Sequence, residues 1–329
     1  MKLAFIIDPI EGLDPTHDTS VALMEAAGVM GDQVWITTLE HLSVIKGQTW
    51  ATMQSISVPP AVLEGDRWLI SQPWYTLGDP ELLPLNFMDV VFMRKDPPVT
   101  VAYLYATYLL DSIDPKRTLV INAPAGIRAA NEKMYALQFE AVIPRTIVSQ
   151  EKATIRNFVE SETAAVLKPL GGKAGEGILF LRPEDPNLNS MIEISTHQGR
   201  LPVMVQEYLP AAREGDKRII LLAGEPIGAV NRVPTGQEFR GNMATGGRVV
   251  ATPITERDRF ICDQVKASLI RDGLFFVGID VIGDYLTEVN VTSPTGIREI
   301  DRLAGHASTS DQSLGRQVIA WLTQQCGTP

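Results

Sequence analysis

The chain has 329 residues, more than one simple hydrophobic core accommodates, so we expect two or three domains. It is 45% hydrophobic and 21% charged, as in ordinary soluble globular proteins, and 29 lysines and arginines against 39 acids give a net charge of −10. No arginine-rich run or basic helix offsets this acidity, which argues against a nucleic-acid or anionic-membrane partner.

The cysteines, the histidines and the lengths of the apolar runs indicate the cellular compartment and limit the kinds of metal site. Only Cys262 and Cys326 are present, without CxxC spacing, which fits a reducing compartment and excludes a thiol-ligated metal framework. Four scattered histidines suggest no zinc site. The opening MKLAFIIDPIEG is expected to be a strand rather than a signal peptide, and no run reaches the roughly 18 apolar residues of a membrane span. We therefore expect a cytoplasmic protein.

The N-terminal part of the chain predicts an open α/β sheet. An apolar strand at 3–7, a helix at 20–27 and a strand at 33–37 form a β-α-β start, and such sheets bind ligands at the carboxyl ends of their strands. No GxGxxG follows the first strand, so no dinucleotide site is predicted. Residues 39–87, rich in tryptophan and proline, read as irregular. Further strands are expected at 89–93 and 119–122, and a helix at 101–110.

Two charged segments follow this sheet. MRKDPP (93–98) lies at the carboxyl end of a strand, where its charges could face a ligand or simply form a turn before the next helix. Lys133 is expected in the first turn of a helix at 131–141, where a cation opposes the helix dipole. An anionic ligand nearby would explain that placement.

A glycine-rich loop, PLGGKAGEG (169–177), separates strands expected at 164–168 and 178–182. Its glycines let backbone N–H groups wrap an anion, with Lys168 projecting from the entering strand. The loop runs into a strand, whereas a P-loop runs into a helix, so a β-loop-β phosphate flap is predicted. The alternative is a flexible hairpin without a ligand. The four glycines are Gly171, Gly172, Gly175 and Gly177.

The next segments offer a base site, a pair of cations and a lid. A strand at 203–208 stops before Leu209-Pro210, and we interpret it as an edge strand whose terminal backbone groups could take up an adenine edge. Arg218 and Arg232 are expected at neighbouring ends of a hairpin, where two guanidiniums could clamp phosphate or carboxylate oxygens. Loop 234–247 holds four glycines and reads as a lid. Arg240 and Asn242 are its polar side chains.

The stretch VGIDVIGDYLTEVNVTSPTGIREI (277–300) carries the most informative pattern. Glu288 and Asn290 are two apart on an expected strand and share a face, and with Asp280 they offer hard oxygen ligands suited to Mg²⁺ or Mn²⁺. The alternative is a solvated strand face. A regular two-residue turn would pair Asp280 with Thr287 and send it to the wrong side. The metal role therefore predicts an odd-length connection or a β-bulge.

The order of these motifs resembles the ATP-grasp ligases and, within them, the bacterial-type glutathione synthetases. The resemblance implies an N-terminal open α/β domain (1–122) followed by the two α+β subdomains of an ATP-grasp fold (123–204 and 205–329). The segments that carry it are MRKDPP, NEK, LKPL, GDKR, RGNMATGGR and the 277–300 stretch, together with the opening IIDPI.

The resemblance implies ATP-dependent joining of γ-glutamylcysteine to glycine through an acyl phosphate, with ADP and phosphate released. It also implies a homo-oligomer, as a tetramer. Lys133, Lys168 and the loop glycines would hold the ATP phosphates, Gln206, Glu207, Tyr208 and Leu209 the adenine, and Asp280, Glu288 and Asn290 two Mg²⁺ ions. Arg218 would stabilise the transferring phosphoryl group and the acyl phosphate, and Arg240 of the lid would be a second catalytic residue. The residues that would serve the peptide substrate are Arg232, Asn242, Ser293, Pro294, Thr295 and Arg298.

Some positions and rival functions stay open. The flap differs from the methionine-containing loop of many relatives, so Lys173 and Glu176 receive no role, and Glu207 could face solvent. The rival enzyme is another ATP-grasp ligase, such as a D-alanine–D-alanine or ribosomal-protein glutamate ligase. The rival of a different class is a non-catalytic nucleotide-binding protein.

Overall fold

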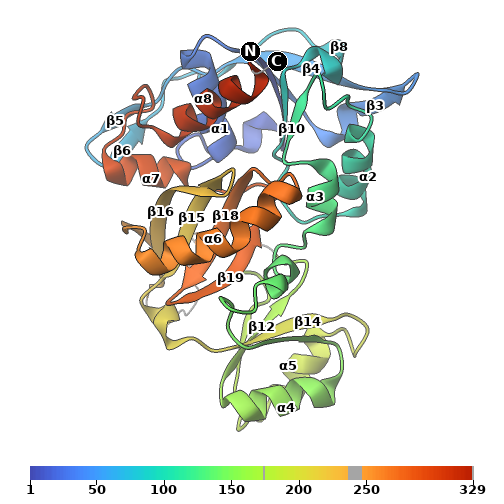
Figure 1. Ribbon diagram of the computed structural model, residues 1–329, viewed down its shortest axis with the longest axis vertical. Coiled ribbons are helices and arrows are strands. Elements are labelled where there is room, and N and C mark those ends of the chain that lie inside the picture. Colours follow the sequence, from blue (N-terminus) through green and yellow to red (C-terminus); the bar gives the residue numbers. More distant parts are fainter. Residues whose placement is uncertain (173–174, 236–246, 328–329) are drawn as a thin grey trace.

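The computed structural model describes residues 1–172, 175–235 and 247–327. Three main β-sheets follow one another along the long axis of the molecule, with helices packed on each (Figure 1). A mixed sheet lies at one end, a five-stranded sheet in the middle and a four-stranded sheet at the other end (Figure 1).

The first sheet begins as the predicted open α/β arrangement. Its four parallel strands have the order β10-β9-β1-β2, which confirms the β-α-β start. They comprise β1 (Lys2–Ile6), β2 (Gln33–Thr37), β9 (Val90–Met93) and β10 (Leu119–Ile121).

Helices cover both faces of these parallel strands. Leu3 and Phe5 of β1 belong to a hydrophobic cluster shared with α1 (Thr19–Val29) and α8 (Leu314–Cys326). The intervening residues of β1 belong to a cluster shared with α2 (Val101–Leu110) on the opposite face. Because both faces are buried, the strands are apolar throughout rather than alternating. The C-terminal helix thus packs on the N-terminal sheet, as Figure 1 shows.

The interpretation of residues 39–87 as irregular is wrong. This segment extends the first sheet with antiparallel strands, of which β4 (Gln48–Ser57) is the longest and pairs with β2, β3, β7 and β8. The other strands of this sheet are β3 (Leu42–Ile45), β7 (Thr76–Leu77) and β8 (Glu81–Pro84). Strands β5 (Val62–Glu64) and β6 (Arg67–Leu69) form a separate two-stranded sheet. Short 3-10 turns are η1 (Ile10–Gly12), η2 (Leu39–His41) and η3 (Leu85–Phe87).

The second sheet has the order β11-β14-β12-β13 and is antiparallel. β14 is paired on both sides, so its interpretation as an edge strand is wrong. Two helices bury one face of the sheet, and Ala165 and Leu167 of β12 point into that cluster. The alternate residues of β12 face the other way. The elements are β11 (Thr146–Ser149), β12 (Ala165–Pro169), β13 (Leu179–Leu181), β14 (Val203–Glu207), α4 (Lys152–Glu162) and α5 (Leu188–Ser195).

The third sheet is antiparallel, with the order β17-β16-β15-β18-β19, and is covered by α6 on one face and by α7 and α8 on the other. A short 3-10 turn, η5, precedes β15. The elements are η5 (Pro210–Arg213), β15 (Asp216–Leu222), β16 (Glu225–Val233), β17 (Arg248–Ala251), α6 (Glu256–Arg271), β18 (Phe276–Ile282), β19 (Tyr285–Asn290) and α7 (Ile297–Ala304).

The β18–β19 hairpin contains the predicted irregularity. Its connection is a two-residue turn, because Ile282 pairs with Tyr285, yet Asp280 pairs with Glu288 rather than with Thr287. The register shifts between Asp280 and Val281, so one extra residue on β19 forms a bulge. The bulge alternative is therefore confirmed.

The helix predicted at 131–141 is wrong. After α3 (Pro124–Ala129), the chain forms only a 3-10 turn, η4 (Met134–Gln138), and Lys133 immediately precedes it. This segment lies along β19, with the Val289 amide donating to the Glu132 carbonyl over 2.9 Å. Among the described residues, no helix is both long and apolar enough to cross a membrane.

Candidate active site

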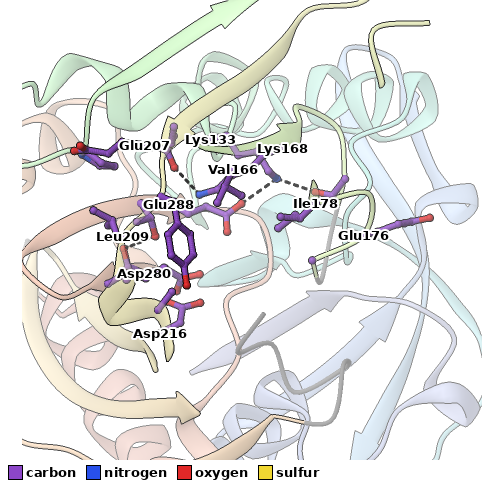
Figure 2. Close-up of a pocket in the computed structure, with 18 residues that line it drawn as sticks. Lys133, Val166, Lys168, Glu176, Ile178, Glu207, Leu209, Asp216, Asp280 and Glu288 are labelled. Carbon is purple, nitrogen blue, oxygen red and sulfur yellow. Dashed lines mark hydrogen bonds and ion pairs between the residues drawn. The ribbon is translucent and has the colours of Figure 1, made fainter. Parts of the chain in front are cut away.

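A pocket lies between the second and third sheets and collects most of the predicted ATP-site residues (Figure 2). Strands β12 and β14 form one wall, and β15, β18 and β19 contribute to the other. Its lining residues are Lys133, Pro144, Val166, Lys168, Gly172, Gly175, Glu176, Ile178, Gln206, Glu207, Tyr208, Leu209, Ala212, Asp216, Asp280, Ile282, Thr287 and Glu288.

One part of the pocket suits a flat aromatic base. The four predicted hinge residues 206–209 all line it, and Val166 and Ile178 add apolar side chains. The Glu207 carboxylate binds Arg145 through Nε and Nη2 at 3.1 and 3.0 Å, so this side chain ties β14 to the chain before β11. Val166 was missed by the sequence reasoning, although it lies two residues before Lys168 on β12 and therefore shares its face.

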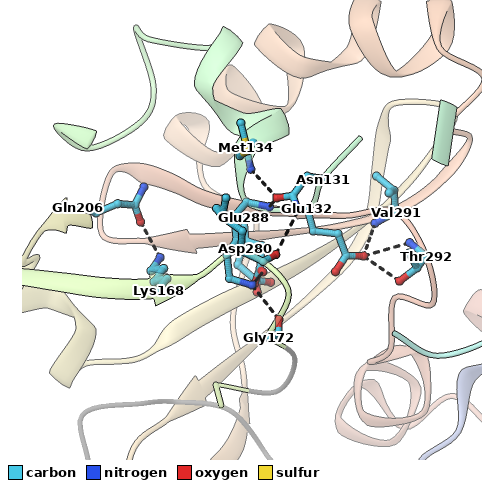
Figure 3. Close-up of polar contacts among 12 residues, drawn as sticks. Asn131, Glu132, Met134, Lys168, Gly172, Gln206, Asp280, Glu288, Val291 and Thr292 are labelled. Carbon is cyan, nitrogen blue, oxygen red and sulfur yellow. Dashed lines mark hydrogen bonds and ion pairs between the residues drawn. The ribbon is translucent and has the colours of Figure 1, made fainter. Parts of the chain in front are cut away.

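Two lysines converge on the pocket from different elements. Lys168 Nζ donates to Gln206 Oε1 over 2.6 Å, and burial lowers the pKa of Lys168 (Figure 3). Lys133 Nζ lies 3.1 Å from Glu288 Oε1 and donates to the Gly172 carbonyl over 2.9 Å. Both predicted phosphate-binding lysines thus meet at one site, although they are 35 positions apart in the sequence.

The glycine-rich loop contributes unevenly. Gly172 and Gly175 line the pocket, together with Glu176, whereas Gly171 and Gly177 lie outside its lining. Gly177 has φ of +69°, and a Cβ there would lie 2.8 Å from Pro169 Cγ, so the turn requires glycine at this position. Lys173 lies outside the described residues.

Two arginines and two aspartates form a network of ion pairs next to the lysines. Arg218 Nε and Nη2 contact the two Asp280 carboxylate oxygens at 2.5 and 3.0 Å, and Arg232 Nη2 lies 2.9 Å from Asp280 Oδ2. Burial alone would raise the pKa of Asp280, but the two guanidiniums outweigh it and hold that pKa well below its ordinary value. Asp216, 2.6 Å from Arg232, has its pKa raised to about 6 by burial.

The predicted metal ligands share one face of the β18–β19 hairpin. The bulge brings Asp280 opposite Glu288, and Asn290 follows two residues later. Asn290 Nδ2 is buried and has no hydrogen-bond partner among the described residues. The described part of the chain contains no cluster of three His, Cys, Asp or Glu suited to a metal, so the third ligand here would be the Asn290 amide oxygen. Two carboxylates and an amide are the hard oxygen donors that divalent cations such as Mg²⁺ prefer.

The 293–295 loop is held by two arginines. The Pro294 carbonyl accepts from Arg94 Nη2 over 3.0 Å, and the Thr295 carbonyl accepts from Arg218 Nη1 over 3.2 Å. Arg94 belongs to the MRKDPP segment and is buried, and it also donates to Ser20 over 3.1 Å. The sequence signal for Arg94 was its place at the carboxyl end of a parallel strand, next to a loop distant in sequence.

Several predicted substrate residues lie elsewhere or outside the described chain. Arg298 is not brought to the pocket: it is buried, with Nη2 2.6 Å from Glu25 Oε2 and its guanidinium 5.0 Å from the Trp68 ring centre. Arg232 points into the Asp216–Asp280 network. Ser293 is half-buried in the held loop. Arg240 and Asn242 lie outside the described residues.

Family models match almost the whole chain. The model described as prokaryotic glutathione synthetase, N-terminal domain, covers residues 1–128, and the ATP-grasp domain model of the same family covers 132–305. The chain belongs to the prokaryotic glutathione synthetase family. It is 66% identical to a glutathione synthetase of Thermosynechococcus vestitus, with 98% of this chain and 99% of that protein covered. The Synechocystis glutathione synthetase is 60% identical, with 99% and 100% covered.

Solved structures of distantly similar proteins have the same fold. The chain is similar to a D-cycloserine synthetase, with a TM-score of 0.66 at 15% identity, over 99% of this chain and 100% of that one. It is also similar to an ATP-grasp ligase solved with a precursor peptide and AMPPNP, with a TM-score of 0.61 at 15% identity, over 99% and 98%. The predicted fold class is therefore confirmed: an N-terminal α/β domain precedes an ATP-grasp ligase fold, which uses ATP with a divalent metal.

Proposed function

We propose that this chain, an ATP-grasp ligase of the glutathione synthetase family, joins γ-glutamylcysteine to glycine in the pocket between its second and third sheets. The products are glutathione, ADP and phosphate. The observation that carries the proposal is the meeting of Lys133 and Lys168 with Asp280 and Glu288 in one pocket, with Asn290 two residues beyond Glu288 on the same strand. Neither a peptide-bond ligase that works without ATP nor a simple carboxylate-binding protein needs both the two lysines and the candidate metal ligands.

The chemistry explains why cations line the pocket. A carboxylate reacts poorly with an amine, because its oxygen is a bad leaving group. In the first step a carboxylate oxygen of γ-glutamylcysteine bonds to the γ-phosphorus of ATP, and the bond to the bridging oxygen of ADP breaks. In the second step the glycine nitrogen bonds to the acyl carbon, phosphate leaves, and the nitrogen loses a proton. Both steps need positioning and neutralised negative charge more than a nucleophilic side chain.

The protein's own side chains would divide this work. Lys168 is held by Gln206 with its ammonium toward the pocket, and Lys133 lies opposite it beside Glu288, so both suit ATP phosphates. Arg218 reaches from Asp280 to the Thr295 carbonyl, between the phosphate region and the 293–295 loop. We therefore propose Arg218 as the residue that stabilises the transferring phosphoryl group and the acyl phosphate.

Asp280, Glu288 and Asn290 would hold Mg²⁺, or Mn²⁺ in its place. When bound, such ions neutralise phosphate charge and orient the phosphoryl oxygens. The carboxylates of Asp280 and Glu288 also pair with Arg218, Arg232 and Lys133. ATP phosphates would attract these cations and release the carboxylates, so we expect metal binding to be much tighter with nucleotide than without it.

The peptide would lie beside the 293–295 loop, with Ser293, Pro294 and Thr295 lining its site. Arg298 and Arg232 would act from behind that site, by fixing α7 to Glu25 and by holding Asp280. Catalytic Arg240 and substrate-binding Asn242, on the predicted lid 234–247, stay predictions.

The larger organisation is also part of the proposal. We propose the division 1–122, 123–204 and 205–329, in which the boundary at 204 falls inside β14 and α8 packs back on the first unit. A tetramer and a cytoplasmic location stay predictions.

A substrate-omission assay tests the function. Purified protein with ATP and Mg²⁺ should release ADP only when γ-glutamylcysteine and glycine are both present, as measured by a coupled ADP assay and by mass detection of glutathione. ADP release with D-alanine alone would favour the rival ligase. Nucleotide binding without turnover on any substrate would favour the non-catalytic alternative.

A further inference from the structure

The strand that carries two of the candidate metal ligands is the last strand of its sheet. Among the described strands, β19 pairs with β18 on one side only, so its outer edge needs other partners for its backbone. The segment before and after η4 supplies them: the Val289 amide donates to the Glu132 carbonyl over 2.9 Å, and the Leu286 amide donates to the Val142 carbonyl over 2.8 Å.

Beyond the end of β19, the side chain of Glu132 replaces the missing strand. Glu132 Oε1 accepts from the Val291 amide at 3.0 Å, from the Thr292 amide at 3.1 Å and from Thr292 Oγ1 at 2.8 Å (Figure 3). Val291 and Thr292 are buried. Without the carboxylate, two buried amides would lose their acceptor, which is unfavourable for buried donors.

These contacts bracket Asn290. The backbone is fixed to Glu132 at residue 289 and again at 291 and 292, and Asn122 Nδ2 holds the Val291 carbonyl from the other side over 2.7 Å. The direction of the Asn290 side chain therefore depends on Glu132, which is not itself a candidate metal ligand. Glu132 is absent from the pocket lining, whereas its neighbour Lys133 is part of it.

The same two residues also couple the metal face to the ATP site. Because Glu132 is fixed along β19, the next residue projects its ammonium to within 3.1 Å of Glu288. A shift of the 131–133 segment would move Lys133 and release Asn290 together.

We propose that Glu132 is a positioning residue, which fixes Asn290 and Glu288 in the geometry that a nucleotide-bound divalent cation needs. This inference rests on the proposed function, since it assigns a supporting role at the same metal face. Residues that orient metal ligands typically contribute about 10- to 100-fold to metal affinity.

The test measures Mn²⁺ binding directly, by the electron paramagnetic resonance signal of free Mn²⁺ in the presence of a non-hydrolysable ATP analogue. Glu132→Ala should weaken binding about 10- to 100-fold. Glu132→Gln keeps an acceptor oxygen at the same reach and should restore binding to within a few-fold. Glu140→Ala, an exposed glutamate after the same 3-10 turn, should bind Mn²⁺ as the wild type does.

Hydrogen exchange provides the second readout. In Glu132→Ala the amides of Val291 and Thr292 should exchange at least tenfold faster, while amides of the second sheet keep the wild-type rate. If Glu132→Ala does not fold, Glu132→Asp serves instead, because its shorter side chain keeps the charge but cannot span the same distance. Wild-type Mn²⁺ affinity in Glu132→Asp or Glu132→Ala would overturn the inference.

The two hypotheses fail differently. If the wild-type protein with nucleotide binds no Mn²⁺, the metal face of the proposed function is wrong. If the wild type binds Mn²⁺ and the Glu132 variants bind it equally well, only the positioning role is wrong.

Discussion

Replacing Lys168 by methionine tests whether the positive charge of this residue serves catalysis or the stability of the fold. Among the residues that the structure describes, Lys168 Nζ makes one hydrogen bond, to Gln206 Oε1 at 2.6 Å, and its charge interacts with Glu288 and Asp216 across the pocket. Burial lowers its pKa, so the folded protein tolerates this ammonium at an energetic cost. A residue kept despite such a cost is expected to act on a ligand.

The two effects of Lys168→Met have different magnitudes. Methionine preserves the volume of the side chain, and the lost hydrogen bond of about 1–2 kcal/mol is partly offset by the removal of a poorly solvated charge. The free energy of unfolding should therefore change by no more than about 1 kcal/mol. Loss of a cation from the transferring phosphates should cost about 3–4 kcal/mol, or roughly 10²- to 10³-fold in kcat/KM for ATP.

The assay pairs urea unfolding with ADP release, and Lys152→Met is the control. Lys152 Nζ also makes a 2.6 Å contact, to Glu193, but both side chains are about 40% exposed (43% and 40%) and lie outside the pocket lining. That variant should keep wild-type kinetics within about twofold. Turnover by Lys168→Met within threefold of wild type would refute the phosphate role. A loss of stability of several kcal/mol would instead show that Lys168 is chiefly structural.

Three further outcomes follow from the charges of the site and of α7. Asp280→Asn leaves Arg218 and Arg232 without their shared carboxylate, so the free energy of unfolding should fall by about 3 kcal/mol or more in chemical denaturation. Burial raises the pKa of Asp301 to about 7 from 3.8, so the folded chain binds a proton that the unfolded chain has lost between these values. The contribution of this raised pKa to the free energy of unfolding is complete below pH 3.8 and declines as pH rises toward 7. In Asp301→Asn the midpoint of urea unfolding should therefore depend less on pH over this range. Chelation of divalent metal by EDTA should abolish ADP release and leave the far-ultraviolet circular dichroism spectrum unchanged, because Asp280 and Glu288 also have Arg218 and Lys133 as ion-pair partners. Unfolding on chelation would contradict this.

Parts of the fold with strong local patterns were predictable from the sequence. The parallel strands are continuous apolar runs, and α2 begins and ends at the predicted residues 101 and 110. β4 was missed because its buried positions include small and polar residues such as Thr49 and Ala51, which weaken the period-two signal. The helix expected around Lys133 is absent because that segment pairs with the edge of β19, a tertiary contact that overrides local helix preference.

The residues of the site likewise divide into those that a local sequence pattern predicts and those that depend on distant contacts. A lysine before a glycine loop and polar residues alternating on a strand are local signals, and Lys168 and Glu288 line the pocket. Arg298 shows the limit: its motif suggested a substrate contact, but its partner Glu25 lies 273 positions away and buries it. Glu132 shows the converse, since its partners 291 and 292 are about 160 positions away and nothing local indicates them.

The β18–β19 hairpin combines both kinds of information. The Gly283-Asp284 dipeptide favours a two-residue turn, and Gly283 indeed has φ of +57°. That turn alone would place Asp280 opposite Thr287, on the face away from Glu288. The requirement that three oxygen ligands share a face adds the missing constraint, and one extra residue satisfies both. Thr287 lines the pocket beside these ligands, and its hydroxyl donates to the Asp280 carbonyl over 3.2 Å. Turn chemistry and ligand chemistry together therefore predict a bulge that neither predicts alone.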